Sequence, residues 1–352
     1  MPRGRISPIC AVRGSQVTTE GDRQAQRRNP VNRALGGWQP AAVVMAANKL
    51  DFFTTIGDGS LSAEEVASRC DTHPRSTRAL LDACVALGVM EKSDDLYRNS
   101  PEALQSLVRG RPAFMGDGIA HQHDLWQPWG RLHEAVRTGK RVGERYSLVE
   151  ETDVHRNFIM AMHNRAVPSA PVLAEALDLT GRRQLFDAGG GPGTYSIFLV
   201  KRYPGLRAIV FDLPQTVEIA REVIAGYGMS DVVTTRAGDY FKDDFGQGND
   251  VVLLSAILHS MGPKRSRTLL SKAYDSLESG GLVVVNEGLI DDDRTSPLGA
   301  VLFSLNMLVN TGEGQSYSAS EIIGLMESVG FVRPRVIPLE AVRSSLVVSA
   351  KP

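Results

Sequence analysis

The sequence predicts an α/β protein with a doubly wound sheet in its C-terminal half and a smaller, mainly helical domain before it. From residue 183 onward, short apolar segments rich in β-branched residues alternate with helical segments, as expected of parallel strands covered on both faces. A glycine-rich stretch follows the first of these strands, at the edge where such sheets bind ligands. Nearer the N-terminus, helix, turn, helix and hairpin signals predict a winged-helix unit.

The composition is that of a globular protein without a strong net charge. Among 352 residues, 39 Lys and Arg oppose 40 Asp and Glu, and the formal net charge is −1. This balance argues against nucleic acid or an anionic membrane as a partner of the chain. The three cysteines lack zinc-ligand spacing, and no apolar run reaches the ~18 residues needed to cross a bilayer. We therefore expect a cytoplasmic protein without a structural metal.

The N-terminal part divides into a tail, a winged helix and a helical segment. Residues 1–30 are rich in arginine and small polar residues and predict a disordered tail. Residues 31–100 predict the winged helix: an apolar helix over 38–53, a capping box at Ser62 and Glu65, a helix from Pro74, and a hairpin. Its acidic side chains would repel phosphates, so dimerisation is favoured over DNA binding. Residues 101–180 have a helical pattern.

The α/β domain is predicted over residues 181–352. We expect its strands within 183–190, 207–213, 231–239, 250–258 and 280–289, and its helices within 194–203, 214–228, 264–279 and 319–331. Two further strands, over 333–339 and 344–352, are separated by too few residues for a crossover helix. These last two strands must therefore pair antiparallel.

The glycine-rich loop, LFDAGGGPGTYS over residues 185–196, has three candidate ligands. A phosphate-binding P-loop is excluded because no lysine follows Gly193. A dinucleotide fingerprint is disfavoured because Thr194 stands where its third glycine belongs. The remaining candidate is S-adenosylmethionine (SAM), whose amino-acid end carries an ammonium group and which has no phosphate.

Acidic side chains follow three successive strands at the same edge of the predicted sheet. We expect Asp187 to balance the ammonium group, Asp212 to accept from the ribose hydroxyls, and Asp239 to accept from the adenine amino group. An aspartate at a strand end also commonly caps a helix or a turn, which is the alternative for each one singly. The other predicted cofactor contacts are Gly189, Gly191, Gly193, Leu213, Gly238, Tyr240, Phe241 and Ser255.

Six motifs carry a family resemblance that runs from about residue 31 to the end: FDAGGGPGTYS, VFDLP, AGDYF, ILHSM, NEGL and NMLVNTGEGQSYS. With them the chain resembles the class I SAM-dependent methyltransferases, and more closely the small-molecule O-methyltransferases that have an N-terminal winged-helix dimerisation domain. The resemblance implies SAM as cofactor, a small-molecule acceptor, a homodimer and an acceptor-gating role for residues 101–180.

The resemblance also implies a general base. His259 in ILHSM matches the family base that takes the proton of an acceptor hydroxyl, and imidazole is suited to this near neutral pH. Glu287 in NEGL matches the glutamate that orients this histidine. Two positions depart from the family: Ser255 stands where many members place a cofactor-binding lysine, and Ser316 where they place a second glutamate.

With Ser316 in place of the second glutamate, His259 would have only one carboxylate partner. Two functions other than methylation of a hydroxyl therefore stay open. One is S-methylation of a thioether acid such as a methylthio-hydroxybutyrate, on the route to dimethylsulfoniopropionate, because a sulfur acceptor needs no base. The other is a winged-helix regulator that binds SAM or another metabolite without turnover.

The acceptor site is predicted from the helical segment and one later methionine. Phe158, Met162 and Met307 match family positions that line the reacting methyl group, although such residues at helical spacing are also typical of a core. Further candidates for acceptor recognition are His121, Trp126, Trp129, Arg141, Tyr146 and His163.

Overall fold

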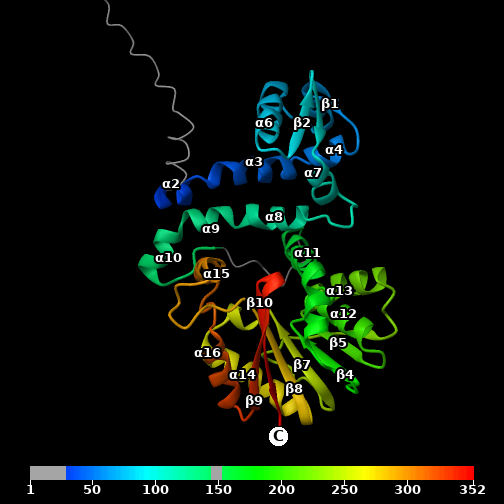
Figure 1. Cartoon of the computed structure of the whole chain (residues 1–352), viewed down its shortest axis with the longest axis vertical. Helices are drawn as coiled ribbons and strands as arrows, with labels where there is room; N and C mark the ends of the chain where they lie inside the picture. Colours follow the sequence, from blue (N-terminus) through cyan, green and yellow to red (C-terminus); the bar gives the residue numbers. More distant parts are fainter. Residues whose placement is uncertain (1–28, 144–152) are drawn as a thin grey trace, which may run out of the picture.

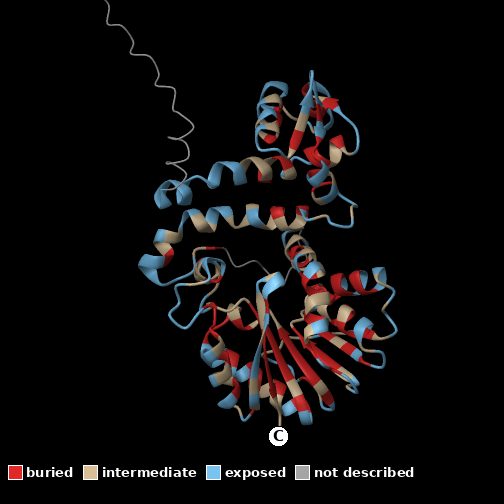
Figure 2. Ribbon diagram, viewed as in Figure 1, coloured by how far each residue is buried: buried red, intermediate tan, exposed pale blue. Residues whose placement is uncertain are grey.

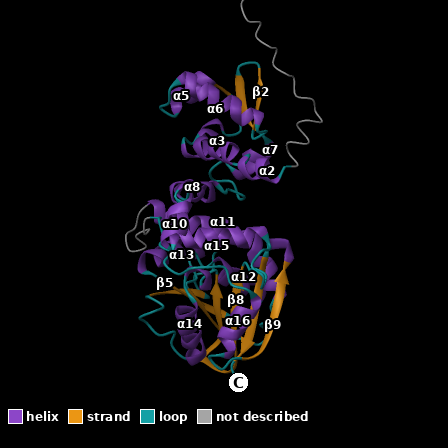
Figure 3. Cartoon of the chain, turned by 90° about the vertical axis from the view of Figure 1, so that its left-hand side faces the viewer, coloured by secondary structure: helices purple, strands orange, loops and turns teal. Residues whose placement is uncertain are grey.

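The computed structural model describes residues 29–143 and 153–352. A small helical region lies at one end of the molecule and an α/β domain at the other (Figure 1). Three helices, α3 (Trp38–Lys49), α8 (Gly116–Asp124) and α11 (Asp153–Ala176), stack between the two regions (Figure 3). The arrangement places the helical segment directly above the sheet edge where the glycine loop lies.

The α/β domain contains a seven-stranded sheet in the order β6-β5-β4-β7-β8-β10-β9. The strands are β4 (Gln184–Ala188), β5 (Arg207–Asp212), β6 (Val233–Ala237), β7 (Asn249–Ser255), β8 (Leu277–Glu287), β9 (Val332–Leu339) and β10 (Ser344–Ala350). Strands β4 to β8 pair in parallel, whereas β10 is antiparallel to both β8 and β9. The predicted fold class is confirmed, including the antiparallel end of the sheet.

Two hydrophobic cores cover the two faces of this sheet. Along β7, Val251 and Leu253 point into one core and Val252 and Leu254 into the other, because successive strand residues face opposite sides. The first core contains residues of α11, α12 (Thr194–Arg202) and α13 (Pro214–Gly226), and the second contains residues of α14 (Pro263–Ser276) and α16 (Ala319–Glu327). The central strands β4, β7, β8 and β10 are mostly buried, whereas the edge strands β6 and β9 are largely exposed or intermediate (Figure 2). This double coverage explains why the sequences of the central strands are continuously apolar.

The N-terminal region has the predicted order of helix, helix and hairpin. It contains α2 (Pro30–Leu35), α3, α4 (Phe52–Ile56), β1 (Leu61–Ser62), α5 (Ala63–Arg69), α6 (Pro74–Ala86), β2 (Met90–Ser93), β3 (Leu96–Asn99) and α7 (Pro101–Ser106). The three strands form one small sheet. The capping box is present, since the Glu65 N–H donates to Ser62 Oγ at 3.2 Å and the Ser62 N–H donates to Glu65 Oε2 at 2.8 Å.

One predicted helix was wrong in extent. The expected helix over 38–53 is two helices, because Asp51 adopts a left-handed φ of 56° between α3 and α4. The outward face of α2 and α3 exposes large apolar side chains, with Val31, Leu35 and Trp38 each more than half exposed (Figure 2).

Three helices and two single helical turns complete the described part of the chain. They are α9 (Trp126–Gly130), α10 (Leu132–Thr138), α15 (Leu298–Asn310) and the two single turns η1 (Leu258–Ser260) and η2 (Glu340–Val342). Helix α15, which the sequence did not predict, packs against α9 and α10. Over the described ranges, no helix is both long and apolar enough to span a membrane.

Candidate active site

The glycine loop joins β4 to α12 and folds tightly against β5. The Gly189 N–H donates to the Phe211 carbonyl at 2.7 Å, which holds the loop on the neighbouring strand. A Cβ on Gly190 would lie 2.7 Å from Cγ of Asp187, so this position accepts no side chain. Gly193 has a left-handed φ of 74° where the chain turns into α12. The loop therefore presents bare backbone at the carboxyl edge of the sheet.

Asp187 lies at the end of β4, directly beneath this loop, and is 1% exposed. Ser196 Oγ donates to its Oδ2 at 2.6 Å, while its buried Oδ1 has no hydrogen-bond partner. Burial raises the pKa of Asp187 to about 7, against the opposing effect of the Ser196 hydrogen bond. A cation bound at the loop would relieve the cost of this partly unpaired carboxylate.

Asp212 ends β5 and accepts several hydrogen bonds. The Leu213 N–H donates to Oδ1 at 2.7 Å and the Gly191 N–H donates to Oδ2 at 2.9 Å. The Thr216 hydroxyl is a third donor. Burial nevertheless raises the pKa of Asp212. The side chain stays half-buried, and a carboxylate with about four acceptor positions keeps capacity for a ligand hydroxyl.

Asp239 follows β6 and is held by its own turn. The Phe241 N–H donates to Oδ1 at 2.9 Å, and Lys242 Nζ lies 3.2 Å from Oδ2. Burial alone would raise the pKa of Asp239, but these two contacts hold it below its usual value. The Arg265 guanidinium lies 3.8 Å from the centroid of the Phe241 ring, a cation–π contact.

Tyr240 and Ser255 complete the set of predicted cofactor contacts. Tyr240 lies next to the loop, because a Cβ on Gly189 would be 3.6 Å from its ring. Ser255, at the end of β7, accepts a 2.9 Å hydrogen bond from the Asn286 amide. Gly238 packs under Phe211, whose ring would be 2.4 Å from an added Cβ. The three strand ends thus bring the predicted residues to one edge of the sheet.

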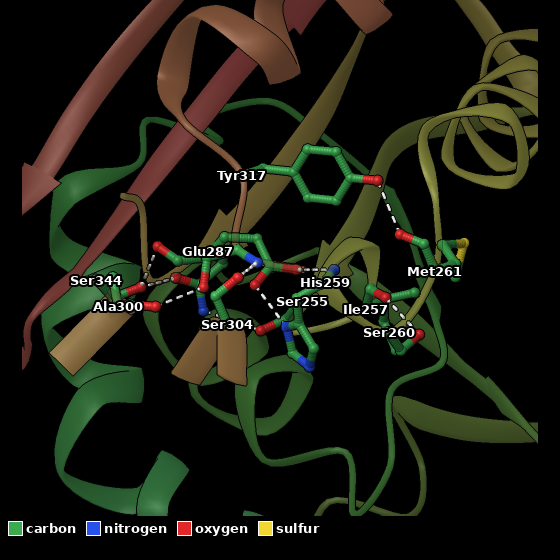
Figure 4. Close-up of polar contacts among 12 residues, drawn as sticks. Ser255, Ile257, His259, Ser260, Met261, Glu287, Ala300, Ser304, Tyr317 and Ser344 are labelled. Atoms are coloured by element: carbon green, nitrogen blue, oxygen red, sulfur yellow. Dashed lines mark hydrogen bonds and ion pairs between the residues drawn. The ribbon is translucent and has the colours of Figure 1, made fainter. Parts of the chain in front are cut away.

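His259 and Glu287 form a close pair above this edge (Figure 4). His259 lies in η1 after β7, and Glu287 is the last residue of β8. Nδ1 of His259 is 2.7 Å from Oε2 of Glu287, and the backbone N–H of His259 donates to Oε1 at 3.3 Å. Their side chains are 15% and 5% exposed, respectively. The Glu287 carboxylate accepts a hydrogen bond from Nδ1 of His259. The other ring nitrogen, Nε2, therefore points away from Glu287.

Neighbouring side chains fix the orientation of this pair. The Phe303 ring of α15 meets the imidazole edge to face, with 4.7 Å between centroids. Tyr317 donates its hydroxyl to the Met261 carbonyl at 2.8 Å, which anchors the segment just after η1 (Figure 4). Ser316, the position of the missing glutamate, donates to the Ala300 carbonyl at 2.7 Å. Its hydroxyl is thus committed to the backbone of α15.

The predicted acceptor residues fall into a group on α8 and α11 and a group near α15. His121 and Phe158 meet edge to face, with 5.2 Å between centroids, and burial lowers the pKa of His121. Met162 is half-buried on α11, and Met307 is buried on α15. Trp129 donates its indole N–H to Asn306 Oδ1 at 2.9 Å.

Four candidates remain: His163 on α11, Arg141, Trp126 and Tyr146. His163 bonds through Nδ1 to Thr194 Oγ1 at 2.8 Å, which places it against the cofactor loop. Arg141 is exposed and Trp126 is 42% exposed. Tyr146 lies outside the described residues. Sequence reasoning gave no role to Phe303, which lies outside the six motifs, or to Asn306, which begins NMLVNTGEGQSYS, because their partners come from distant segments.

Two family models match the chain. One, described as an O-methyltransferase domain, matches residues 129–332, and the other, an O-methyltransferase dimerisation domain, matches residues 34–107. The chain belongs to this O-methyltransferase family. It is a SAM-dependent methyltransferase that acts on hydroxyl groups of small molecules. The dimerisation model covers the predicted winged helix, and the predicted family is thereby confirmed.

Individual relatives cover most of the chain. A 3-hydroxy-5-methyl-1-naphthoate 3-O-methyltransferase of Streptomyces sahachiroi is 36% identical over 86% of this chain and 89% of its own length. A tetracenomycin 8-O-methyltransferase of Streptomyces glaucescens is 34% identical over 88% and 92%. The solved structure of human N-acetylserotonin methyltransferase with SAM superposes with a TM-score of 0.83 at 26% identity, covering 96% of this chain and 99% of that one.

The residues at the sheet edge fit SAM as the cofactor. The buried Asp187 Oδ1 lacks a partner, Asp212 keeps acceptor capacity, and a Cβ on Gly191 would meet nothing within 4 Å, so open space lies beside the loop. These are the requirements of a ligand with an ammonium group, two ribose hydroxyls and no phosphate. Within the described part of the chain, no cluster of three or more His, Cys, Asp or Glu side chains is arranged to hold a metal ion.

Proposed function

We propose that this O-methyltransferase methylates an aromatic hydroxyl of a small molecule, with His259 as the general base and Glu287 as its partner. The observation that carries the proposal is the 2.7 Å contact between Nδ1 of His259 and Oε2 of Glu287. Its relatives act, by their names, on a hydroxynaphthoate and on a tetracenomycin polyketide, which are aromatic acceptors. These names favour a hydroxyl over a thioether acceptor and over a metabolite-responsive regulator.

The His259–Glu287 pair supplies the proton transfer. A carboxylate can only accept a hydrogen bond, so Nδ1 carries the proton and Nε2 is left as the acceptor. Nε2 then takes the hydroxyl proton of the acceptor, and Glu287 stabilises the imidazolium that forms. Because Ser316 donates to Ala300, Glu287 is the carboxylate that acts on this imidazole. Phe303 keeps the ring from rotating away from the acceptor.

The cofactor side is held by the strand-end aspartates. SAM supplies an electrophilic methyl group on a sulfonium. Asp187 balances the ammonium group through the glycine loop, and Asp212, with Leu213, binds the ribose hydroxyls. Asp239 accepts from the adenine amino group, and Tyr240 and Phe241 pack against the adenine ring, with Gly238 and Ser255 beside them. In-line transfer needs both reactants to be fixed in a dry site, and such positioning supplies much of the acceleration.

The acceptor lies between α11 and α15 in this proposal. Phe158, Met162 and Met307 line the side that faces the methyl group, and His121, Trp129 and His163 surround it. Trp126 and Arg141 are assigned to the outer rim, and Tyr146, which lies outside the described residues, stays a predicted acceptor contact. We also propose that the chain has four parts: a tail over 1–30, a winged-helix dimerisation domain over 31–100, an acceptor-gating segment over 101–180 and the SAM-binding domain over 181–352. The exposed apolar face of α2 and α3 is the proposed homodimer contact.

Turnover with and without the base tests this function. The purified protein is given SAM with a labelled methyl group and a panel of hydroxynaphthoates, anthracyclinone phenols and thioether acids. We expect labelled aromatic ethers, and a loss of at least ~10²-fold in their formation by His259→Ala. Transfer to a thioether alone, or equal rates for His259→Ala and the unaltered protein, would overturn the proposed role of the histidine.

A further inference from the structure

Helix α11 is hydrogen-bonded to the cofactor edge of the sheet through two histidine–threonine contacts. Nε2 of His155 lies 3.2 Å from Oγ1 of Thr216, and Nδ1 of His163 lies 2.8 Å from Oγ1 of Thr194. Thr216 is in the first turn of α13, just after Asp212, and Thr194 begins α12, just after Gly193. Both threonines therefore adjoin residues assigned to the cofactor.

The first contact reaches a cofactor ligand directly. Thr216 also bonds to Asp212, whose ionised carboxylate can only accept, so the Thr216 hydroxyl donates to Asp212. Its oxygen is then left to accept the Nε2–H of His155. His155 is 3% exposed and Thr216 is 1% exposed. The result is a buried chain of hydrogen bonds from α11 to the carboxylate that is assigned to the ribose.

The second contact reaches the glycine loop. Thr194 is 1% exposed, and burial lowers the pKa of His163, so the imidazole is neutral and has a single N–H. A hydrogen bond between two buried polar groups is costly to break, because neither group can form a hydrogen bond to water instead. The position of α11 is thus tied to the loop that turns at Gly193.

The same helix carries acceptor-lining residues. Phe158 and Met162 lie on α11 between His155 and His163 in the sequence. Phe158 also contacts His121 of α8. A further bond joins α11 to α12, where Ser169 Oγ and the Tyr195 hydroxyl are 3.0 Å apart, but neither residue is assigned to a ligand. The His155 and His163 contacts, by comparison, end on threonines that bond to or adjoin residues assigned to the cofactor.

We infer that His155 and His163 are positioning residues, which couple cofactor binding to the placement of α11 and so to the acceptor site. The inference rests on the proposed function, since it takes Asp212 and the glycine loop as cofactor ligands. When the cofactor binds at Asp212 and the glycine loop, it holds Thr216 and Thr194 in place. These two threonines in turn hold α11, the helix that carries Phe158 and Met162. Cofactor binding and acceptor binding should then strengthen each other, because a coupling between two sites is reciprocal.

The test combines binding and hydrogen exchange on the full-length protein, with S-adenosylhomocysteine (SAH) as the probe. The double variant Thr194→Val, Thr216→Val keeps the shape of both side chains and removes both hydroxyls. Thr194→Ser, Thr216→Ser restores the hydroxyls, and Tyr195→Phe removes the neighbouring α11–α12 contact as a matched control. SAH affinity is measured by calorimetry, and amide exchange is followed along α11 and along β4 and its loop.

We expect SAH to slow exchange in both regions of the unaltered protein. In the valine variant, we expect SAH affinity to fall by about tenfold or more, because Asp212 loses the hydroxyl that donates to it. The slowing should persist at β4 but vanish from α11. The serine variant and Tyr195→Phe should behave like the unaltered protein.

Two results would count against the inference. Slowing of α11 in the valine variant equal to that in the unaltered protein would overturn the coupling alone, as would the same loss of α11 slowing in Tyr195→Phe. If the unaltered protein fails to bind SAH, the proposed function falls and takes this inference with it.

Discussion

The imidazole of His259 and the carboxylate of Glu287 form a bidentate arrangement, in which one glutamate accepts from both the ring Nδ1 and the backbone N–H of the same histidine. The backbone contact fixes Glu287 relative to η1, and the side-chain contact fixes the ring. One carboxylate therefore sets both the position and the tautomer of the base. In the proposed mechanism, this one glutamate is sufficient, since Ser316, where the resemblance implies a second glutamate, donates to the Ala300 carbonyl instead.

The pair should act as one unit in catalysis. Glu287→Gln keeps the shape of the side chain but loses the charge that stabilises an imidazolium, so we expect turnover on a phenol to fall by about 10- to 100-fold, less than for His259→Ala. The double variant should be little worse than His259→Ala alone, because the glutamate acts through the histidine. Single-turnover rates with saturating SAM check this, and fully multiplied losses in the double variant would contradict it.

Cofactor affinity provides the control for these variants. Neither His259 nor Glu287 is assigned to the cofactor, so SAH affinity measured by calorimetry should change by less than about threefold, as expected for sites without shared partners. A large loss of SAH affinity in Glu287→Gln would mean that the glutamate supports the cofactor site rather than the base.

Gly190 should tolerate no side chain. A Cβ there would approach Asp187 Cγ to 2.7 Å and Val210 Cγ1 to 2.9 Å, and both neighbours are buried. We expect Gly190→Ala to lower the free energy of unfolding by about 1–3 kcal/mol, the usual cost of overpacking. Gly226→Ala is the matched control, because an added Cβ meets nothing within 4 Å at this position. Urea unfolding measures both, and equal stabilities for the two variants would refute the steric argument.

The fold could be predicted from the sequence because its signals are local. The alternation of apolar strands and helices gave the order of elements, and the short interval between Leu339 and Ser344 forced an antiparallel hairpin. The break at Asp51 was missed because an aspartate with a left-handed φ leaves little trace in an apolar pattern. Helix α15 was missed because its sequence is apolar on nearly every side, without a clear stripe.

The site was predictable only where a residue belongs to a strand end. Asp187, Asp212, Asp239, His259 and Glu287 follow or end strands, so their common edge could be inferred from the topology. The contact of Trp129 with Asn306 spans 177 residues, and no local pattern encodes it. The same holds for the ring of Phe303 against His259, which depends on how α15 packs over the sheet.

Asp212 should be needed for cofactor binding more than for folding. In Asp212→Asn, the amide nitrogen would face one of the two N–H donors, Gly191 or Leu213, and the charge would be lost. We expect SAH affinity to fall by about 10- to 100-fold, since hydrogen bonds to charged groups contribute about 1.5–3 kcal/mol. Asp178→Asn, at an exposed turn where Oδ1 accepts the Thr180 N–H, is the control and should bind SAH normally. Equal affinities in calorimetry would remove Asp212 from the cofactor site.

Asp187 should make cofactor binding depend on pH. Burial raises its pKa to about 7, above the ordinary value of 3.8, so in the free protein the group is protonated below that pH. The stability that the protonated form contributes is present below about pH 4 and is lost as the pH rises through about 7. As the pH rises from about 4 to about 7, the free energy of unfolding of the unaltered protein should therefore fall relative to that of the Asp187→Asn variant, whose side chain cannot titrate.

A ligand ammonium favours the ionised carboxylate, so SAH binding should release a proton near pH 6 and none from this group near pH 8. Calorimetry in two buffers with different ionisation enthalpies counts the protons. Two groups act on Asp187: Ser196 donates a hydrogen bond to it, and the carboxyl group of Asp212 raises its pKa. The pKa of Asp212 is itself raised, so a small proton release can remain in Asp187→Asn. Undiminished proton release at pH 6 in that variant would show that Asp187 does not sense the ammonium group. Tighter SAH binding at pH 8 than at pH 6, lost in Asp187→Asn, would place the carboxylate next to the amino-acid end of the cofactor.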